Sequence, residues 1–416
     1  MLVVGLNYAP ESTGIAPYTS GLAEELARRG WRTAVVSTFE HYPQWSFGPS
    51  RPGREQRTSL AGVVLTRVRH VLPLSPTGLS RVFSELSFGF AASARRWPRV
   101  DVVVLVSPAL IASAVALLRA RLLTRTPVVI WVQDLYSLGV RELGGGKSSP
   151  FTKVIAQIEG WCLRRADGVV VIHERFRDTV VEALGVKPDA VTVVRNWSHL
   201  EAGRFVDRSA VRRRLGWALD DFIVLHAGNM GVKQGLENVV KSARAATLAG
   251  SRVRFVLVGD GNQRKHLEAL ATEVPALSMY TSMPDDEFLD TLNAADVLLV
   301  NERGGVAGMA VPSKLTSYFS TGLPVIAATD ARSVTASEVL LAEAGVVVAP
   351  DDPDALLLAA ESLAADPARA RKLGANGLRF RSTRLTPIAS FDRFVKLLRG
   401  LAARRNPLAT KESGNG

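Results

Sequence analysis

The stretch that decides the fold is IVLHAGNMGVKQGLE, residues 223–237. Four of its first five residues are apolar, which predicts a buried strand, and a helical pattern begins where the stretch ends. A strand that passes through a glycine turn into a helix is the first half of a βαβ unit. Gly228 and Gly231 allow backbone N–H groups to approach an anion closely, and Lys233 adds a positive charge. This turn is therefore a candidate diphosphate clamp, with Lys233 as an ordinary surface lysine the alternative.

The same alternation of strand and helix extends from this stretch in both directions. In the second half, five further apolar runs predict strands at residues 254–258, 277–280, 297–300, 325–327 and 345–348. In the first half, seven runs do so at residues 2–6, 33–37, 63–68, 102–106, 128–132, 169–172 and 191–194. Amphipathic helices such as residues 17–29 lie between them. The sequence thus predicts the α/β class with doubly wound parallel sheets.

The chain is too long for one ordinary core, because it has 416 residues. We expect a first domain over residues 1–200 and a second over residues 201–385, each with its own sheet. A helix over residues 386–405 follows the second sheet, and the polar tail 406–416 is predicted to be disordered. Ligands of such sheets bind beyond the carboxyl ends of the strands. A cleft between the two domains is therefore the expected place for a reaction.

Charge is concentrated in residues 51–125, which carry twelve arginines and only three acidic residues of a chain whose net charge is +12. Apolar residues accompany the arginines, a combination that favours a surface for anionic lipid or a lipid-diphosphate acceptor. The alternatives are a plain solvated surface or a nucleic-acid surface, and no nucleic-acid motif accompanies the charge. The candidates for this acceptor and membrane surface are Arg81, Phe83, Phe88, Arg95 and Arg96.

Two further features bear on the compartment. The single cysteine, Cys162, excludes an intramolecular disulfide and fits a reducing compartment, and the first residues are predicted to be a strand and not a signal sequence. Residues 102–118 are almost free of charge, but they are short for a transmembrane span and are interrupted by Ser107-Pro108. We expect a strand there, followed by a helix over residues 109–122 that Ser107 caps.

Other turns extend the phosphate-binding pattern. Gly14 lies between the first strand and the first helix, and Gly259 follows the strand that ends at residue 258. The Gly259 turn is not a dinucleotide fingerprint, because Arg264 occupies the third glycine position. GGGKS at residues 144–148 fails the spacing of a nucleotide-binding phosphate loop and is interpreted as a plain loop. Asp352 and its neighbours are interpreted as a helix cap, so no metal is expected.

Seven segments in order resemble the bacterial glycosyltransferases of family 4, which are retaining GT-B enzymes. They are NYAPE with TGIA (7–16), HYP (41–43), QDLY (133–136), NW (196–197), GNMG (228–231), KQGL (233–236), and VPSKL with GLPVI (311–326). The branch they resemble comprises colanic-acid and O-antigen biosynthesis transferases, many of which use fucose or N-acetylfucosamine donors. The resemblance runs from the first strand to about residue 385 and is specific for the family but not for a substrate.

The resemblance implies that the second domain binds most of a nucleotide-sugar donor and that a C-terminal helix crosses back to the first domain. Lys233 then neutralises the leaving diphosphate, and oriented amides stabilise its charge without a metal. Asp134 is the candidate for contacting the acceptor hydroxyl or the reacting sugar, and a turn-capping role is its alternative. The implied donor-binding set is Gly14, Gly228, Asn229, Gly231, Lys233, Gly259, Met283, Pro312, Ser313 and Lys314.

Three departures from the family pattern stand out. The two family glutamates near the donor are Met309 and Ser317 here, so Glu302 or Asn301 is the candidate to replace them. The family arginine upstream of the phosphate lysine is Asn229. The histidine of the first domain is replaced by Gln133, beside Asp134. We interpret these changes as traits of the branch.

Together these observations predict a retaining, metal-independent glycosyltransferase without a cofactor. It moves a sugar from a nucleotide-diphosphate donor, with UDP favoured over GDP, to a lipid-linked or glycan acceptor in cell-surface polysaccharide synthesis. The expected location is cytoplasmic, peripheral on the inner face of the plasma membrane, with no nucleic-acid partner. The alternatives are a nucleotide-sugar epimerase and a non-catalytic nucleotide-sugar-binding protein.

Overall fold

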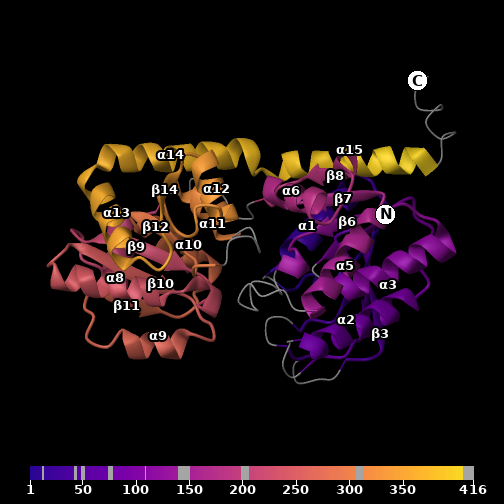
Figure 1. Cartoon of the computed structure of the whole chain (residues 1–416), viewed down its shortest axis with the longest axis horizontal. Helices are drawn as coiled ribbons and strands as arrows, with labels where there is room; N and C mark the ends of the chain where they lie inside the picture. The colour runs from indigo at the N-terminus through magenta and orange to yellow at the C-terminus, as the bar shows by residue number, and fades with distance from the viewer. Residues whose placement is uncertain are drawn as a thin grey trace. The chain divides into compact units, whose positions relative to one another are not determined.

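The computed structural model describes residues 1–11, 14–41, 45–47, 52–73, 78–107, 109–138, 150–197, 206–305 and 313–405. The chain forms two compact units (Figure 1). Unit 1 contains residues 1–196 together with residues 387–416, and unit 2 contains residues 197–386. Each unit is built on its own sheet, surrounded by helices. The predicted α/β class and the two doubly wound, Rossmann-like sheets are confirmed.

Unit 1 has an eight-stranded sheet in its described residues, in the order β3-β4-β2-β1-β5-β6-β7-β8. Its strands are β1 (Leu2–Val4), β2 (Ala34–Thr38), β3 (Glu55–Leu60), β4 (Val63–Val68), β5 (Val103–Ser107), β6 (Val128–Val132), β7 (Gly168–Val171) and β8 (Val191–Val193). Its helices are α1 (Ala16–Arg28), α2 (Gly78–Ser93), α3 (Leu110–Arg119) with the π-helical turn η1 (Ala120–Thr124), α5 (Pro150–Arg165), α6 (Glu174–Glu182) and α15 (Pro387–Arg405). A short 3-10 turn, η2 (Pro188–Ala190), precedes β8.

Unit 2 has a six-stranded parallel sheet in its described residues, in the order β11-β10-β9-β12-β13-β14. Its strands are β9 (Phe222–Ala227), β10 (Val253–Val258), β11 (Leu277–Tyr280), β12 (Val297–Asn301), β13 (Val325–Ala328) and β14 (Gly345–Val348). Its helices are α7 (Arg208–Leu215), η3 (Val232–Gln234), α8 (Glu237–Leu248), α9 (Arg264–Leu270), α10 (Asp285–Ala294), α11 (Ser313–Thr321), α12 (Val334–Leu341), α13 (Pro353–Ala365) and α14 (Pro367–Arg384).

The continuous apolar strands reflect burial on both faces of the unit 2 sheet. Along β9, Ile223 and Leu225 join one hydrophobic cluster, whereas Val224 between them joins a second cluster on the other face. A strand covered by helices on both sides needs apolar residues at consecutive positions, which alternating patterns do not provide. This is why runs such as residues 223–227 identified the strands in the sequence.

One strand was not predicted. β3 consists of six exposed residues and pairs antiparallel with β4 at the edge of the unit 1 sheet. Leu60 and Val63 are opposite each other, so Ala61 and Gly62 form a two-residue hairpin loop with φ values of 49° and 77°. Two-residue hairpin loops are normally recognised in a sequence by the dipeptides Asn-Gly or Asp-Gly. The polar strand and the alanine left no recognisable pattern.

The segment after β5 corrects one expectation. Ser107 ends the strand and does not cap α3; the N-cap position is Ala109, whose side chain makes no capping bond. The amide of Ile111 instead donates to Glu85 Oε2, 3.0 Å away on α2. Asp352, by contrast, caps α13 as expected, since its carboxylate accepts from Ala355 N at 2.9 Å. Among the helices in the described residues, none is long and apolar enough to cross a bilayer.

Helix α15 returns to unit 1 after the second sheet is complete, as the resemblance implied (Figure 1). Phe394 is fully buried against Trp131 of β6, with ring centroids 4.8 Å apart at 73°. Ser390 Oγ donates to Arg195 O at 2.9 Å. An aromatic contact to the central sheet therefore joins the C-terminal helix to unit 1.

Replacing Phe394 by alanine is expected to destabilise unit 1 by about 3–5 kcal/mol, because it leaves a large cavity beside Trp131. Denaturant unfolding, followed by tryptophan fluorescence, measures this change. Ile388→Ala on the same helix is the matched control, since Ile388 is exposed and its loss should stay within about 0.5 kcal/mol. Equal effects of the two substitutions would contradict the packing described here.

Candidate functional site

The predicted glycine turns of unit 2 meet where β9 and β10 end. Gly228 N donates to Val258 O at 2.8 Å, and Gly228 and Gly259 have φ values of 126° and 138°. A Cβ built on Gly259 would lie only 2.0 Å from Gly228 O. No side chain can fit there, so two backbones approach each other at the carboxyl edge of the sheet. This is the geometry in which main-chain N–H groups can face a bound anion.

Lys314 lies over this turn. It is the second residue of α11, and a Cβ on Gly228 would meet Lys314 Cε at 2.7 Å. Its Nζ is 3.3 Å from His226 Nε2, and His226 Nδ1 is 3.2 Å from Leu299 O. Burial, and next the Lys314 charge, hold the pKa of His226 well below its usual range, so the ring is neutral. Burial also lowers the pKa of Lys314 to about 8.

Asn301, the last residue of β12, holds the loop between β9 and α8 in place. Its amide donates to Gln234 O at 2.7 Å and to Gly235 O at 3.0 Å, and its carbonyl accepts from Asn238 at 3.0 Å. Lys233 lies in the short turn η3, where its carbonyl accepts from Arg303 N at 2.9 Å. Asn301 thus fixes the loop that presents Lys233.

The other residues of the predicted donor set are placed less fully. A Cβ on Gly231 would come within 2.9 Å of the Asn229 amide, so Asn229 folds over Gly231. Met283 follows β11 at the same sheet edge, but its side chain packs on the core and its sulfur accepts from Thr291 at 3.3 Å. Ser313 begins α11, and its side chain, like Pro312, lies outside the described residues.

The two residues proposed to replace the family glutamates behave differently. The side-chain amide of Asn301 is already hydrogen-bonded to the β9–α8 loop and to Asn238. Glu302 accepts hydrogen bonds from the hydroxyls of Thr329 at 2.5 Å and Thr335 at 2.6 Å, and burial raises its pKa. Ser317 lies within α11, and Met309 lies outside the described residues. Of the two proposed replacements, Glu302 is therefore the one that places a carboxylate at the end of β12.

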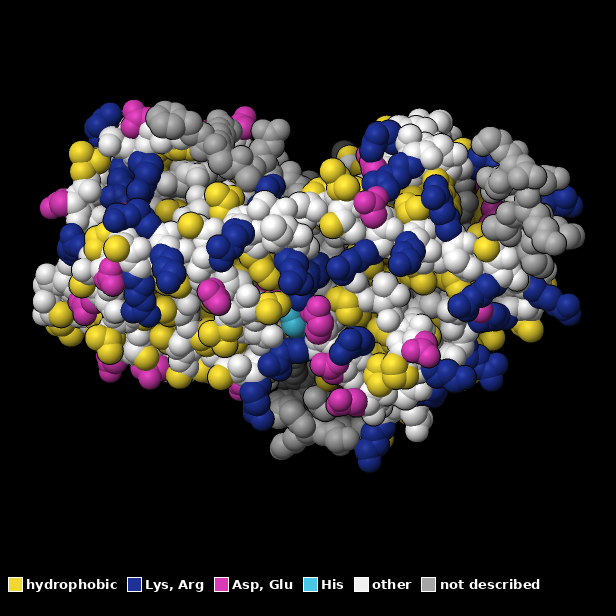
Figure 2. Space-filling model, turned by 90° about the horizontal axis from the view of Figure 1, so that it is seen from above, with side chains coloured by type: hydrophobic (Ala, Val, Ile, Leu, Met, Phe, Trp, Pro, Cys, Tyr) yellow, Lys and Arg dark blue, Asp and Glu magenta, His cyan; other side chains and the backbone are white. Residues whose placement is uncertain are grey.

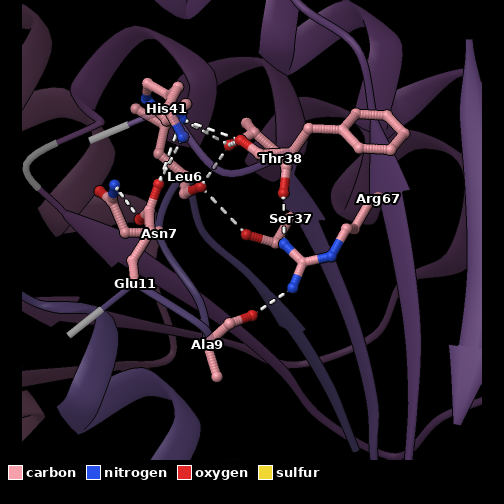
Figure 3. Close-up of polar contacts among 9 residues, drawn as sticks. Leu6, Asn7, Ala9, Glu11, Ser37, Thr38, His41 and Arg67 are labelled. Atoms are coloured by element: carbon pink, nitrogen blue, oxygen red, sulfur yellow. Dashed lines mark hydrogen bonds and ion pairs between the residues drawn. The ribbon is translucent and has the colours of Figure 1, made fainter. Parts of the chain in front are cut away.

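In unit 1, the loop after β1 is anchored by Glu11, which is buried (Figure 3). Its carboxylate accepts from Asn7 Nδ2 at 2.7 Å and from His41 N at 3.0 Å. Arg67 donates to Thr38 O at 2.8 Å and also to Ala9 O, joining the same loop to the end of β2. Gly14 follows in the loop with φ 64°, just before α1 begins at Ala16. These polar contacts thus hold in place the part of the loop that precedes Gly14, the predicted anion-binding position.

Two histidines lie beneath this loop. Their rings are 4.9 Å apart and nearly perpendicular, and burial lowers the pKa of His41 and takes that of His70 to about 3. Both are therefore neutral near pH 7. Neither nitrogen of His70 has a hydrogen-bond partner among the described residues. The pair fills space between α2 and the loop and offers no positive charge.

Asp134 follows β6 and is only partly exposed. The residues after it are held by Glu159, a buried residue of α5. Glu159 accepts from Tyr136 N at 2.7 Å and from Ser137 N at 3.1 Å, as well as from the Ser137 hydroxyl. Gln133, on the other side of Asp134, accepts from Asn196 Nδ2 at 2.8 Å. Asp134 thus lies in a loop that is fixed on both sides.

Besides Glu159, unit 1 has another buried glutamate, Glu85, near Tyr136. Glu85 of α2 accepts from Ile111 N and, at 3.3 Å, from Arg81 Nε, while the Arg81 guanidinium stacks 5.1 Å from the Tyr136 ring centroid. Burial raises the pKa of Glu85 to about 7, partly offset by Arg81. Arg81 is therefore engaged in a network within unit 1, while its side chain stays 36% exposed. Neither Glu85 nor Glu159 could be recognised from the sequence, because each looks like an ordinary helix-surface charge.

The predicted acceptor and membrane surface needs one correction. Phe88 is buried, packed against His70, and cannot contact a membrane. Phe83 and Phe90, which lie seven residues apart and so on one face of α2, are 61% and 63% exposed. Arg95 forms an ion pair with Glu55, and Arg96 is exposed. Leu122 and Leu123 of η1, which the sequence analysis missed, are 75% and 73% exposed.

Comparison with known families gives the class. Residues 13–197 match the family described as Glycosyl transferase 4-like domain, and residues 207–380 match Glycosyl transferases group 1. Sucrose-phosphate synthase from Thermosynechococcus elongatus superimposes with a TM-score of 0.75 at 20% identity, covering 97% of this chain and 99% of that one. The Anabaena protein HepE, in complex with UDP-glucose, gives a TM-score of 0.67 at 16% identity, covering 96% and 100%. The protein is a glycosyltransferase with the GT-B fold.

Relatives by sequence place it further. The chain is 30% identical to the glycosyl transferase WcaI of Escherichia coli K12, which is named for colanic acid biosynthesis, over 77% of this chain and 81% of that protein. It is 25% identical to the glycosyltransferase WbjE of Pseudomonas aeruginosa, over 67% and 70%. The chain therefore belongs to family 4 of the glycosyltransferases.

Glu85 should make the stability of the protein depend on pH. Because its pKa is raised on folding from 4.5 to about 7, the folded state holds a proton that the unfolded state releases, and stability falls as pH rises through this range. Glu85→Gln should remove this loss, so the difference in unfolding free energy between variant and wild type should change by roughly 3 kcal/mol from pH 4.5 to pH 7.5. Denaturant titrations across this range measure it. A pH-independent difference would contradict the raised pKa.

Proposed function

We propose that this glycosyltransferase retains the anomeric configuration, needs no metal, and moves a sugar from a UDP-sugar to a lipid-linked or glycan acceptor in cell-surface polysaccharide synthesis. The observation that supports it most strongly is the paired glycine turn at Gly228 and Gly259 with Lys314 over it. Backbone amides and lysine charges can stabilise a leaving diphosphate as the glycosidic bond breaks. HepE, whose structures contain UDP and UDP-glucose, makes UDP the first nucleotide to test.

Unit 1 is proposed to supply the acceptor side, with Asp134 contacting the acceptor hydroxyl or the reacting sugar. The polysaccharide context comes from WcaI, named for colanic acid biosynthesis. A carboxylate in a rigid loop at the carboxyl edge of a sheet can orient a hydroxyl group at little entropic cost. The proton of the acceptor can leave with the donor's own phosphate, so Asp134 need not act as the base.

We also propose peripheral binding to the cytoplasmic face of an anionic membrane. Phe83 and Phe90 of α2 and Leu122 and Leu123 of η1 are large exposed apolar side chains, and Arg96, Arg121 and Arg125 accompany them in the chain. Apolar insertion combined with arginine attraction to anionic headgroups is the usual basis of such binding. Figure 2 shows further Lys and Arg side chains scattered over α14 and over α15, so a binding test must separate these surfaces.

The donor is tested by a thermal-shift panel of UDP, GDP, ADP, dTDP and their sugars. One nucleoside diphosphate at a hundredfold excess over its dissociation constant should stabilise the protein by about 2.7 kcal/mol. Lys233→Ala should abolish turnover and reduce this shift, because it removes a phosphate-binding charge from the β9–α8 loop. Lys241→Ala is the matched control, since Lys241 is exposed on α8. A panel without any shift would favour a non-catalytic protein.

Asp134→Asn separates transfer from donor binding. It should lower turnover strongly, while the melting temperature and the nucleotide shift stay as in the wild type. Release of free nucleoside diphosphate only when acceptor is present would also exclude an epimerase. Near-normal turnover of Asp134→Asn would remove Asp134 from the proposed site.

The membrane surface is tested with vesicles that contain phosphatidylglycerol. Leu122→Ser combined with Leu123→Ser should weaken sedimentation with these vesicles at low salt by at least about tenfold, because two exposed leucines lose their contribution to insertion. Arg371→Ala with Lys372→Ala on α14 is the control and should change binding little. If the α14 variant loses more binding than the leucine variant, the membrane contact belongs to the other face.

A further inference from the structure

Lys314 is placed where a lysine is costly. It is the second residue of α11, and a cation near the N-terminus of a helix is repelled by the helix dipole. Among the described residues no carboxylate forms an ion pair with it, and Glu302 acts on it only through space. Within the described part of the chain, its hydrogen-bond partner is the neutral ring of His226. An ammonium group so short of negative charge is suited to receive an anion.

His226 fixes where this ammonium lies. The ring also has a backbone contact with Asn229; the tautomer that serves Lys314 carries its proton on Nδ1, donates it to Leu299 O, and leaves Nε2 as an acceptor for Lys314. His226 is fully buried and neutral, so it does not itself act as a cation. The imidazole therefore holds Lys314 Nζ by one of its three N–H groups and leaves two for a ligand.

The surroundings indicate what the ligand is. The stem of Lys314 passes over Gly228, which has no side chain in the way, and Lys314 remains partly exposed. The turn from Gly228 to Gly235 contains a single cation, Lys233, because position 229 is asparagine. A fully ionised nucleoside diphosphate carries about three negative charges, more than one lysine balances. The second cation must therefore come from outside the turn.

We propose that the Lys314 side chain is this second cation for the donor's diphosphate and that His226 is the residue that positions it. The assignment rests on the proposed function, since it names the diphosphate of the nucleotide sugar as the anion. His226 does not touch the substrate; it acts through Lys314.

The test is the affinity for UDP measured by isothermal titration calorimetry between pH 7 and pH 9. Lys314→Met should lower the affinity at least tenfold at pH 7, whereas Lys241→Met on the surface of α8 should leave it unchanged. The wild-type affinity should fall about tenfold from pH 7 to pH 9, as the lysine, whose pKa is about 8, loses its proton. The titratable groups that face Lys314 are His226, whose pKa lies well below its usual range, and Glu302, whose pKa is raised by burial. Lys314→Arg, which stays charged, should show a flat profile.

His226 is tested by coupling. His226→Phe should weaken UDP binding. His226→Gln should restore most of this loss, because its amide can accept and donate as the ring does. The double variant His226→Phe/Lys314→Met should bind UDP no more weakly than Lys314→Met alone. Additive losses would show that His226 acts independently of Lys314 and overturn its role.

The outcomes separate the two proposals. If no nucleoside diphosphate binds the wild-type protein, the proposed function fails and this assignment fails with it. If UDP binds but Lys314→Met keeps the wild-type affinity, the donor site stands and the second cation is overturned. Should Lys314→Met not fold, as judged by circular dichroism, the pH profile of Lys314→Arg decides: a decline as steep as the wild type's overturns the assignment.

Discussion

The contact between the backbones of Gly228 and Gly259 is the constraint on which the donor side of the molecule depends. It is possible only because Gly259 has no Cβ, which would lie 2.0 Å from Gly228 O, and it draws together the loops that follow β9 and β10. Met230 N then donates to Asp260 O and Gln263 N to Met230 O, so the two loops are joined beyond the sheet as the strands are within it. The absence of a side chain at Gly228 gives Lys314 its path over the turn.

The two units hold their loops at the carboxyl edge of the sheet by different means. Unit 2 uses close backbone contacts between glycines, whereas unit 1 uses three buried glutamates that accept backbone N–H groups. Glu11 binds His41 N, Glu85 binds Ile111 N, and Glu159 binds the amides that follow Asp134. A carboxyl oxygen that accepts a buried backbone N–H satisfies it, and an unpaired buried amide is costly. The price of burying these acids is visible in the raised pKa of Glu85 and Glu159.

Much of the fold could be predicted from the sequence because the strands are apolar at consecutive positions and the turns contain glycine. Gly228, Gly259 and Lys314 were predicted from motifs that lie far apart in the chain, and only the tertiary structure brings them together. Phe88 was assigned wrongly because the sequence did not fix the orientation of α2, whose exposed face contains Phe83 and Phe90. Glu85 and Glu159 could not be recognised, since one acid on an amphipathic helix has the pattern of a solvated side chain.

The buried acid of unit 2 has a different part from those of unit 1. Glu302 accepts two threonine hydroxyls, which use two of roughly four lone-pair sites on a carboxylate, so it keeps acceptor capacity for a ligand hydroxyl. It favours the charged form of Lys314, and Lys314 favours the charged form of Glu302, although the two do not form an ion pair among the described residues. A diphosphate bound by Lys314 adds negative charge near Glu302 and so favours its protonated form. On the proposed assignment, the donor's phosphates and the Glu302 proton are therefore linked through a single lysine.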